Sequence, residues 1–184
     1  MATYDGYFRV DLSFVKDTNS GGRIYSAQND EVLPNGVIGV LGATLEDKPE
    51  VKEFEVGAVN GKTLYIVMKP EINYDEQWKD SGALGKFRNP AKKPFPAIRL
   101  QERDRVTFSE DYFVGASDIE VGNVFKVNSD GLLTLGAGSA GDYTFVVTEV
   151  KRSAVPNYLA YDESGAYHAP QPYKLVTVEV IIAE

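Results

Sequence analysis

The sequence of 184 residues contains no cysteine and only one histidine. Without cysteine the chain can form no disulfide, no thiolate nucleophile and no cysteine-bound metal site, so its stability must come from packing and hydrogen bonding. A single histidine excludes a multi-histidine metal site and leaves one way of building a histidine-containing catalytic triad. These absences remove several classes of enzyme and metalloprotein and are compatible with a reducing cytoplasm.

Long apolar runs are also absent. None approaches the roughly 20 residues that span a bilayer, and the opening residues 1–5 lack the basic and apolar regions of a signal peptide. We therefore expect a protein that is neither membrane-inserted nor secreted. Hydrophobic residues nevertheless make up 43% of the chain and aromatic residues 11%, which is enough for one core and a single domain over residues 1–184.

The charge is negative overall but unevenly distributed. A formal net charge of −8 disfavours a general binder of nucleic acid or anionic membranes, because phosphate contacts need cations. Between Lys86 and Arg105, however, seven cations accompany only two carboxylates. This local basic stretch in an acidic protein suits docking to a partner or to a second copy of the chain.

Alternation of apolar and polar side chains is the dominant pattern and predicts half-buried strands. Residues 1–20 form a candidate N-terminal strand or arm, able to add to a neighbour's sheet edge, with four apolar side chains on one face: Phe8, Val10, Leu12 and Phe14. Further strands are expected at residues 143–150 and at the C-terminal end, with one apolar face made by Val176, Val178, Val180 and Ile182. The sequence predicts an all-β fold, a single-domain β-barrel or β-sandwich of short antiparallel strands.

Turn chemistry predicts two hairpins. Asn60-Gly61 lies between the alternating segments 51–58 and 62–68, and both residues tolerate the positive φ of a tight hairpin turn. Ser129-Asp130-Gly131 lies between 119–127 and 132–135 in the same way. Helix signals are few, and the best place for a short helix is residues 74–79.

Residues 70–96 separate two strand-rich halves. This segment holds four of the nine prolines and the single tryptophan, Trp78. We interpret it as a long, ordered central loop excursion, because Trp78, Phe87 and Phe95 offer anchors for packing.

Two motifs with catalytic or nucleotide associations have simpler interpretations. Residues 136–141 match G-x-G-x-x-G, but a strand pattern follows in place of the helix that a dinucleotide site requires. His168 lies in an extended, proline-rich stretch, where a solvated side chain is the usual outcome. We therefore expect no catalytic or cofactor-binding residue at either place.

The acidic residues give no firm metal or catalytic signature. Residues 17–21 resemble the start of a calcium loop, but Gln28 stands where the bidentate glutamate should be. The carboxylates of residues 46–55 could include a glycosidase pair. Only the distance between two carboxyl groups in the folded protein would decide whether they do. Acidic residues in a loop or on the polar face of a strand are more often solvated. The five carboxylates in question are Glu46, Asp47, Glu50, Glu53 and Glu55.

The aromatic and basic stretch from Trp78 to Arg105 has three interpretations. Its cations can cover apolar surface with their aliphatic stems, which is a structural role. Alternatively they form a docking surface, since tryptophan and arginine are favoured in binding hot spots. Single-stranded nucleic acid, stacked on the aromatic rings, is a third option. For the docking interpretation the candidate partner-binding residues are Trp78, Lys86, Arg88, Lys92, Lys93 and Arg99.

Short turn-and-strand phrases lie at residues 22–27, 35–42, 67–76, 96–110 and 119–127, and a valine-rich final strand follows them. In this order they resemble structural proteins of tailed-bacteriophage heads, and the resemblance covers residues 20–184. The resemblance implies a virion component assembled in the host bacterial cytoplasm, a capsid decoration or cement protein that binds the major capsid protein. It supplies no list of functional residues.

We expect a non-enzymatic protein without a cofactor, membrane partner or specific nucleic acid, and a homo-oligomer, for example a trimer. Two rival functions remain open at this point. One is a head–tail connector or tail protein, which would form a ring. The other is a carbohydrate-binding module or hydrolase, which would need a concave pocket with convergent titratable groups.

Overall fold

The computed structural model describes residues 4, 6, 8–15, 22–58, 61–70, 87–116, 118–153 and 173–182. Strands dominate these residues, and the only helical element among them is a 3-10 turn, η2 (Glu110–Tyr112). The prediction of an all-β fold is therefore confirmed. The predicted helix at 74–79 and His168 lie outside the described residues. Within the described part, no helix has the length and apolar character needed to cross a membrane.

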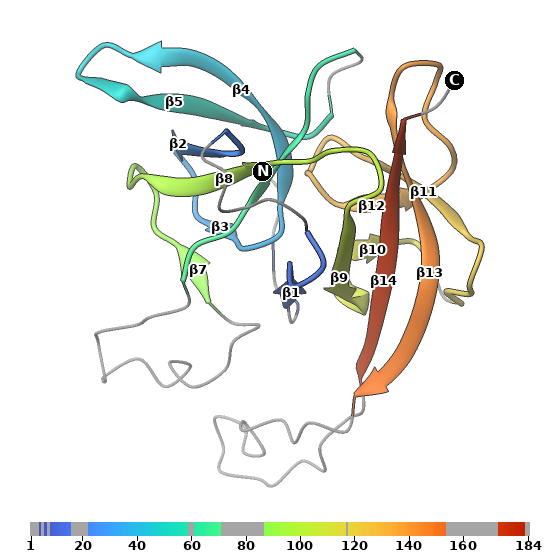
Figure 1. The fold of residues 1–184 in the computed structure, drawn as a ribbon. Helices are drawn as coiled ribbons and strands as arrows, with labels where there is room; N and C mark the ends of the chain where they lie inside the picture. Colours follow the sequence, from blue (N-terminus) through green and yellow to red (C-terminus); the bar gives the residue numbers. More distant parts are fainter. Residues whose placement is uncertain are drawn as a thin grey trace, which may run out of the picture.

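Five strands close into a barrel in the order β2-β5-β4-β6-β8 (Figure 1). Closure leaves no unpaired sheet edge, which is one way in which β proteins avoid edge-to-edge aggregation. All its strand pairs are antiparallel except β2 with β5, which is parallel and departs from the expectation of antiparallel strands. The barrel strands are β2 (Ile24–Gln28), β4 (Ile38–Leu45), β5 (Lys48–Val56), β6 (Tyr65–Val67) and β8 (Phe95–Arg99).

A seven-stranded sheet lies beside the barrel, on the right of Figure 1, in the order β1-β9-β14-β13-β11-β12-β10. The predicted strands at 143–150 and at the C-terminal end are confirmed as its two longest strands, with Val176, Val178 and Val180 fully buried but Ile182 exposed. Two further strands, β3 (Leu33–Pro34) and β7 (Arg88–Asn89), pair separately. The strands of the large sheet are β1 (Val10–Asp11), β9 (Arg105–Ser109), β10 (Phe113–Val114), β11 (Val124–Val127), β12 (Leu133–Leu135), β13 (Tyr143–Ser153) and β14 (Tyr173–Ile182).

The hairpin predicted around Asn60-Gly61 is wrong. Strands β5 and β6 are not neighbours, because β4 lies between them and its Gly39 is paired with both Val56 and Tyr65. The real hairpin joins β4 to β5. Residues 37–40 are all buried, so this apolar run fits a central strand. The burial of these residues determined how β4 pairs, and the Asn-Gly turn signal did not.

Two other sequence expectations fare differently. The hairpin around residues 129–131 is confirmed, with β11 and β12 antiparallel and Gly131 at φ +70°. The strand before it begins at Val124 and not at residue 119. The central excursion is shorter than predicted, because β7 and the start of β8 occupy part of residues 87–96, while residues 71–86 lie outside the described part.

The N-terminal segment completes the sheet of its own chain, which differs from the expectation of an arm that reaches a neighbour. Strand β1 pairs with β9, with Val10 opposite Phe108. Before it, the Tyr4 hydroxyl donates a hydrogen bond of 2.8 Å to the carbonyl of Asp130. Phe14, predicted on the buried face, is 59% exposed.

One hydrophobic cluster connects the barrel and the large sheet. Its buried members include Ile66 and Leu100 from the barrel side and Phe108 and Phe145 from the sheet. Because the two units share this core, they form one domain. A smaller cluster around Phe54 fills the remaining barrel interior.

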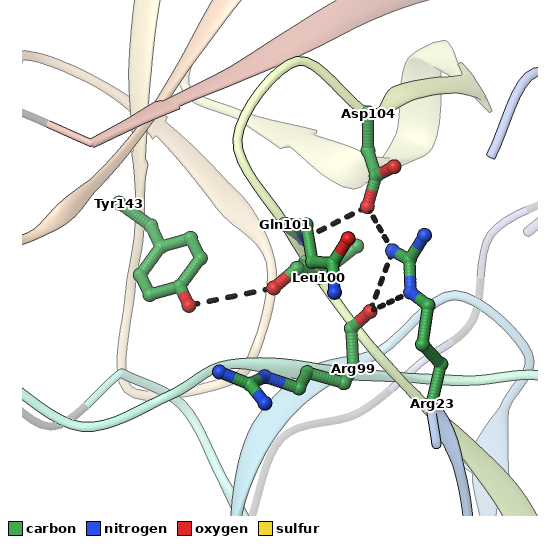
Figure 2. A network of polar contacts seen from close by, with 6 residues as sticks. All are labelled: Arg23, Arg99, Leu100, Gln101, Asp104 and Tyr143. Carbon is green, nitrogen blue, oxygen red and sulfur yellow. Dashed lines mark hydrogen bonds and ion pairs between the residues drawn. The ribbon is translucent and has the colours of Figure 1, made fainter. Parts of the chain in front are cut away.

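A buried ion pair lies at the junction between the two units (Figure 2). Arg23, just before β2, pairs with Asp104 in the turn between β8 and β9, and both side chains are 4% exposed. The Arg23 guanidinium also donates to the carbonyl of Arg99, at 2.8 Å, and the Asp104 carboxylate accepts from the amide of Gln101, also at 2.8 Å. The amide of Val180 in β14 donates to the Asp104 carbonyl at 2.8 Å, so the turn is tied to both units.

Replacement of one partner of this ion pair should destabilise the protein strongly. We expect Asp104→Ala to lower the free energy of unfolding by about 3–5 kcal/mol, because it leaves the Arg23 charge buried without compensation. The double variant Arg23→Met, Asp104→Leu should lose less than the sum of the two single variants. Urea denaturation of the unmodified protein, Arg23→Met, Asp104→Leu and the double variant measures this coupling. A loss below about 1 kcal/mol for Asp104→Ala, measured in the same way, would contradict the account.

The half-buried side chain of Tyr4 should make stability depend on alkaline pH. Burial, with a smaller contribution from Asp130 and then Glu31, raises the pKa of Tyr4 from 10.0 to about 12. The unfolded chain therefore loses this proton first, so that the contribution of Tyr4 to stability is complete below pH 10 and declines as the pH rises towards 12. Denaturation curves between pH 9 and 12 should fall less steeply for Tyr4→Phe than for the unmodified protein. Parallel profiles would show that Tyr4 is not buried in this way.

Candidate docking surface

The structure separates the six candidate partner-binding residues into three groups. Trp78 and Lys86 lie outside the described residues. Arg88 is half-buried in β7. The other three cations are exposed on the barrel: Lys92, Lys93 and Arg99.

Arg88 makes contacts inside its own chain. Its guanidinium donates hydrogen bonds to the carbonyls of Tyr4 at 2.9 Å and Gly6 at 3.1 Å, and lies 5.4 Å from the ring centre of Phe8. A hydrogen bond of 2.9 Å to the carbonyl of Phe87 completes this set. These contacts hold the N-terminal segment against β7, a structural role that differs from the covering of apolar surface considered for this stretch.

Lys92 and Lys93 lie at the tip of the connection from β7 to β8, and we call them the basic turn. Lys92 has φ +57°, a left-handed conformation that costs a residue with a side chain roughly 1–2 kcal/mol. Its amide donates a hydrogen bond of 2.8 Å to the carbonyl of Asn29, which fixes the turn beside the end of β2. No described carboxylate forms an ion pair with either lysine, so both charges face solvent.

An apolar hollow of about 220 Å³ lies next to the basic turn, between β2 and β8. Ile24, on its rim, is 51% exposed, and the strand register places Ser26 opposite Pro96. The ring of Tyr25, one of the lining residues, packs edge to face against that of Tyr65, with 5.4 Å between the ring centroids. The residues that line the hollow are Ile24, Tyr25, Ser26, Pro94, Phe95 and Pro96.

Arg99 lies at the opposite end of β8, beyond the hollow from the basic turn. Its side chain is exposed, while its amide donates to the carbonyl of Arg23 at 2.8 Å and so belongs to the rigid junction. The basic turn, the apolar hollow and Arg99 thus follow one another along β8, and we call this stretch the β2–β8 face. An apolar centre with charged residues at its rim is the usual anatomy of a protein interface.

The acidic residues lie on the other side of β2. Glu50, Glu53 and Glu55 are exposed on β5, and Glu46-Asp47 forms the turn between β4 and β5. Part of this region borders a second hollow, of about 290 Å³, which we call the acidic hollow: Gln28, Asn29, Asp30, Glu31, Leu45, Glu53, Phe54 and Val56. Among the described residues, no group of three or more histidine or carboxylate side chains is placed to hold a metal ion.

The G-x-G-x-x-G segment forms a connection between β12 and β13, as the strand pattern predicted, and no helix follows it. Three of its amides, those of Gly136, Gly138 and Ser139, have partners in the chain. The amide of Ser139 donates to the Asp142 carboxylate at 3.2 Å, and that of Gly138 donates to the Thr144 hydroxyl at 3.1 Å. A phosphate at these amides would have to displace their acceptors, and no helix N-terminus lies behind the segment as it does in a nucleotide-binding loop.

Sequence reasoning found the cationic part of the β2–β8 face and missed its apolar part. Ile24 and Pro94 come from segments far apart in the chain, and only the barrel register brings them together. The one available signal was the closely spaced pair Pro94 and Pro96 around a strand residue, since proline occurs in strands mainly where an amide is not needed for pairing.

No protein-family model, no curated protein and no solved structure matches this chain at a significant level. The chemistry of the β2–β8 face therefore has to carry the functional inference.

The positive φ of Lys92 gives a direct test of the basic turn. We expect Lys92→Gly to leave stability unchanged or to raise it by up to about 1 kcal/mol, because glycine adopts this conformation without steric cost. Lys92→Val should lose more than about 1 kcal/mol, since a β-branched residue is a true outlier at positive φ. Thermal unfolding of the three proteins decides the order. Equal stability of the valine and glycine variants would contradict the turn geometry.

Proposed function

We propose that this protein is a non-enzymatic structural component of a tailed-phage virion, a decoration protein that binds the major capsid protein of the assembled shell. The observation that carries the proposal is the β2–β8 face, in which an apolar hollow has cations at both ends and belongs to a closed barrel. The choice of a phage shell as the partner is supported by the resemblance of the sequence to phage head proteins.

A closed barrel is a suitable carrier for such a face. Its strands are hydrogen-bonded on both edges, so that binding requires little ordering of the backbone, and ordering is one of the main costs of association. The hollow offers apolar surface at the centre of the face, where burial contributes most to affinity. Modest affinity in each copy is sufficient, because contacts repeated over a symmetric shell add through multivalency when copies associate.

The charge distribution favours an acidic partner surface. The protein carries a net charge of −8, so an acidic shell would repel most of its surface and attract the cations of the β2–β8 face. This arrangement orients the protein during encounter and raises the association rate at low ionic strength. Binding should therefore weaken as salt is added, because exposed charges are screened beyond about 8 Å at physiological ionic strength.

Reversal of the three exposed cations tests the proposal. The variant carries Lys92→Glu, Lys93→Glu and Arg99→Glu, and we expect its occupancy on capsids that lack the protein to fall at least about tenfold at low salt. The unmodified protein should saturate the shells at a fixed ratio to the major capsid protein in co-sedimentation. The control variant makes the same change in charge elsewhere on the surface, with Lys62→Glu, Lys126→Glu and Arg152→Glu, and should bind normally.

Unchanged occupancy of the first variant would remove the β2–β8 face from the interface. Failure of the unmodified protein to bind any shell, together with its assembly into a closed ring, would contradict the decoration role and favour a connector or tail component.

A further inference from the structure

We propose that the apolar hollow and the basic turn together bind a short recognition element of the partner. This element consists of one large apolar side chain, which enters the hollow, and a carboxylate one or two residues away in the partner's chain, which meets the basic turn. The inference rests on the proposed function, because it specifies the feature of the shell that the β2–β8 face receives.

The hollow owes its shape to a short side chain among larger ones. Ile24 and Ser26 are two residues apart in β2, so their side chains lie on the same side of that strand. The strand register places Ser26 opposite Pro96. Because the serine side chain is short, it leaves open space at the surface, and the rim is made by larger residues that include Ile24, Pro94 and Pro96.

The size and lining of the hollow suit one apolar side chain of a protein partner. Its volume of about 220 Å³ is below the roughly 300–1,000 Å³ of pockets that hold small-molecule ligands. Ser26 is the only lining residue without an aliphatic, aromatic or proline side chain. A charged group would lose its hydration there without gaining a partner, whereas an apolar side chain gains free energy by burial. The hollow therefore selects a large aliphatic or aromatic side chain.

The basic turn adds positive charge directly beside the hollow. Lys93 precedes Pro94 in the chain, and neither Lys92 nor Lys93 forms an ion pair with a described carboxylate. The turn is already fixed, because the Lys92 amide donates to the carbonyl of Asn29 at 2.8 Å, so that little further ordering is needed on binding. One residue of extended chain spans about 3.3 Å. A carboxylate one or two residues from the buried apolar side chain therefore reaches the basic turn.

Arg99 is too distant to belong to the same short element. It is five positions beyond Pro94 in the sequence, which is about 16 Å along an extended strand. In the proposed function Arg99 contacts a different part of the shell. Substitution of Arg99 consequently separates binding to the shell from binding to the short recognition element.

A disulfide-closed peptide tests the recognition element with no shell present. The probe is Cys-Gly-Glu-Phe-Glu-Gly-Cys, in which ring closure lowers the entropic cost of binding. A titration followed by amide NMR shifts should show saturable binding at low salt, with a Kd of about 1 mM or below. The largest shifts should occur at residues 24–26, 92, 93 and 95. Two control peptides, with alanine in place of phenylalanine or lysine in place of both glutamates, should bind at least about tenfold more weakly.

Matched variants of the protein locate the contact. Ser26→Leu fills the hollow and should bind the probe at least about tenfold more weakly, since the anchoring side chain loses its place. Thr44→Leu introduces the same side chain at another exposed strand position and should bind the probe normally. Arg99→Glu should also bind the probe normally, although it weakens binding to the shell. Thermal unfolding of the two leucine variants checks that both keep the fold.

Three results would overturn the inference: no saturable binding of the probe at millimolar concentration, equal binding of the alanine peptide, or unweakened binding by Ser26→Leu. Self-association of the unmodified protein that Ser26→Leu abolishes would assign the hollow to a second copy and would overturn it as well. If the protein saturates shells but does not bind the probe, this inference alone fails. If it binds the probe but no shell, the proposed function fails and the recognition element stands.

Discussion

The buried ion pair between Arg23 and Asp104 is the contact on which the arrangement of the two β units depends. Two charges that are 4% exposed are tolerated only when they neutralise each other and their remaining donors and acceptors have partners. Arg99 supplies the carbonyl that accepts from Arg23, and Ile24 directly follows Arg23 in the chain. One end of the β2–β8 face is thus fixed to the junction. The ion pair there sets how Arg99 and Ile24 are oriented relative to the large sheet.

Much of the fold could be predicted, because strand patterns depend on local alternation. The C-terminal strand and the hairpin around Gly131 followed from the spacing of apolar residues and from turn chemistry. The pairing of β4 with both β5 and β6 could not be predicted, since the Asn-Gly signal describes only a local reversal of the chain. The buried residues 37–40 belong to a strand that lies between β5 and β6, and that position depends on which side chains share a core. The periodicity of a sequence carries no information about such contacts between distant segments.

The candidate site was predictable to the extent that charge is visible in a sequence. The basic stretch was found, but the pattern could not distinguish Arg88, which binds backbone carbonyls of its own N-terminal segment, from Lys92, which faces solvent. The acidic carboxylates were read as solvated, and their exposure agrees with that. Their position beside the basic turn was invisible, because a parallel pairing of β2 with β5 brings Glu53 next to Gln28.

The central claim is that this protein binds a protein shell through the β2–β8 face. Hydrogen exchange of the shell-bound protein tests it most directly, since exchange reports local protection along the backbone. The account predicts that binding to capsids slows exchange in residues 23–26 and 91–99, while residues 124–135 of β11 and β12 exchange at the rate of the free protein. Protection confined to β11 and β12, with residues 91–99 unchanged, would contradict it.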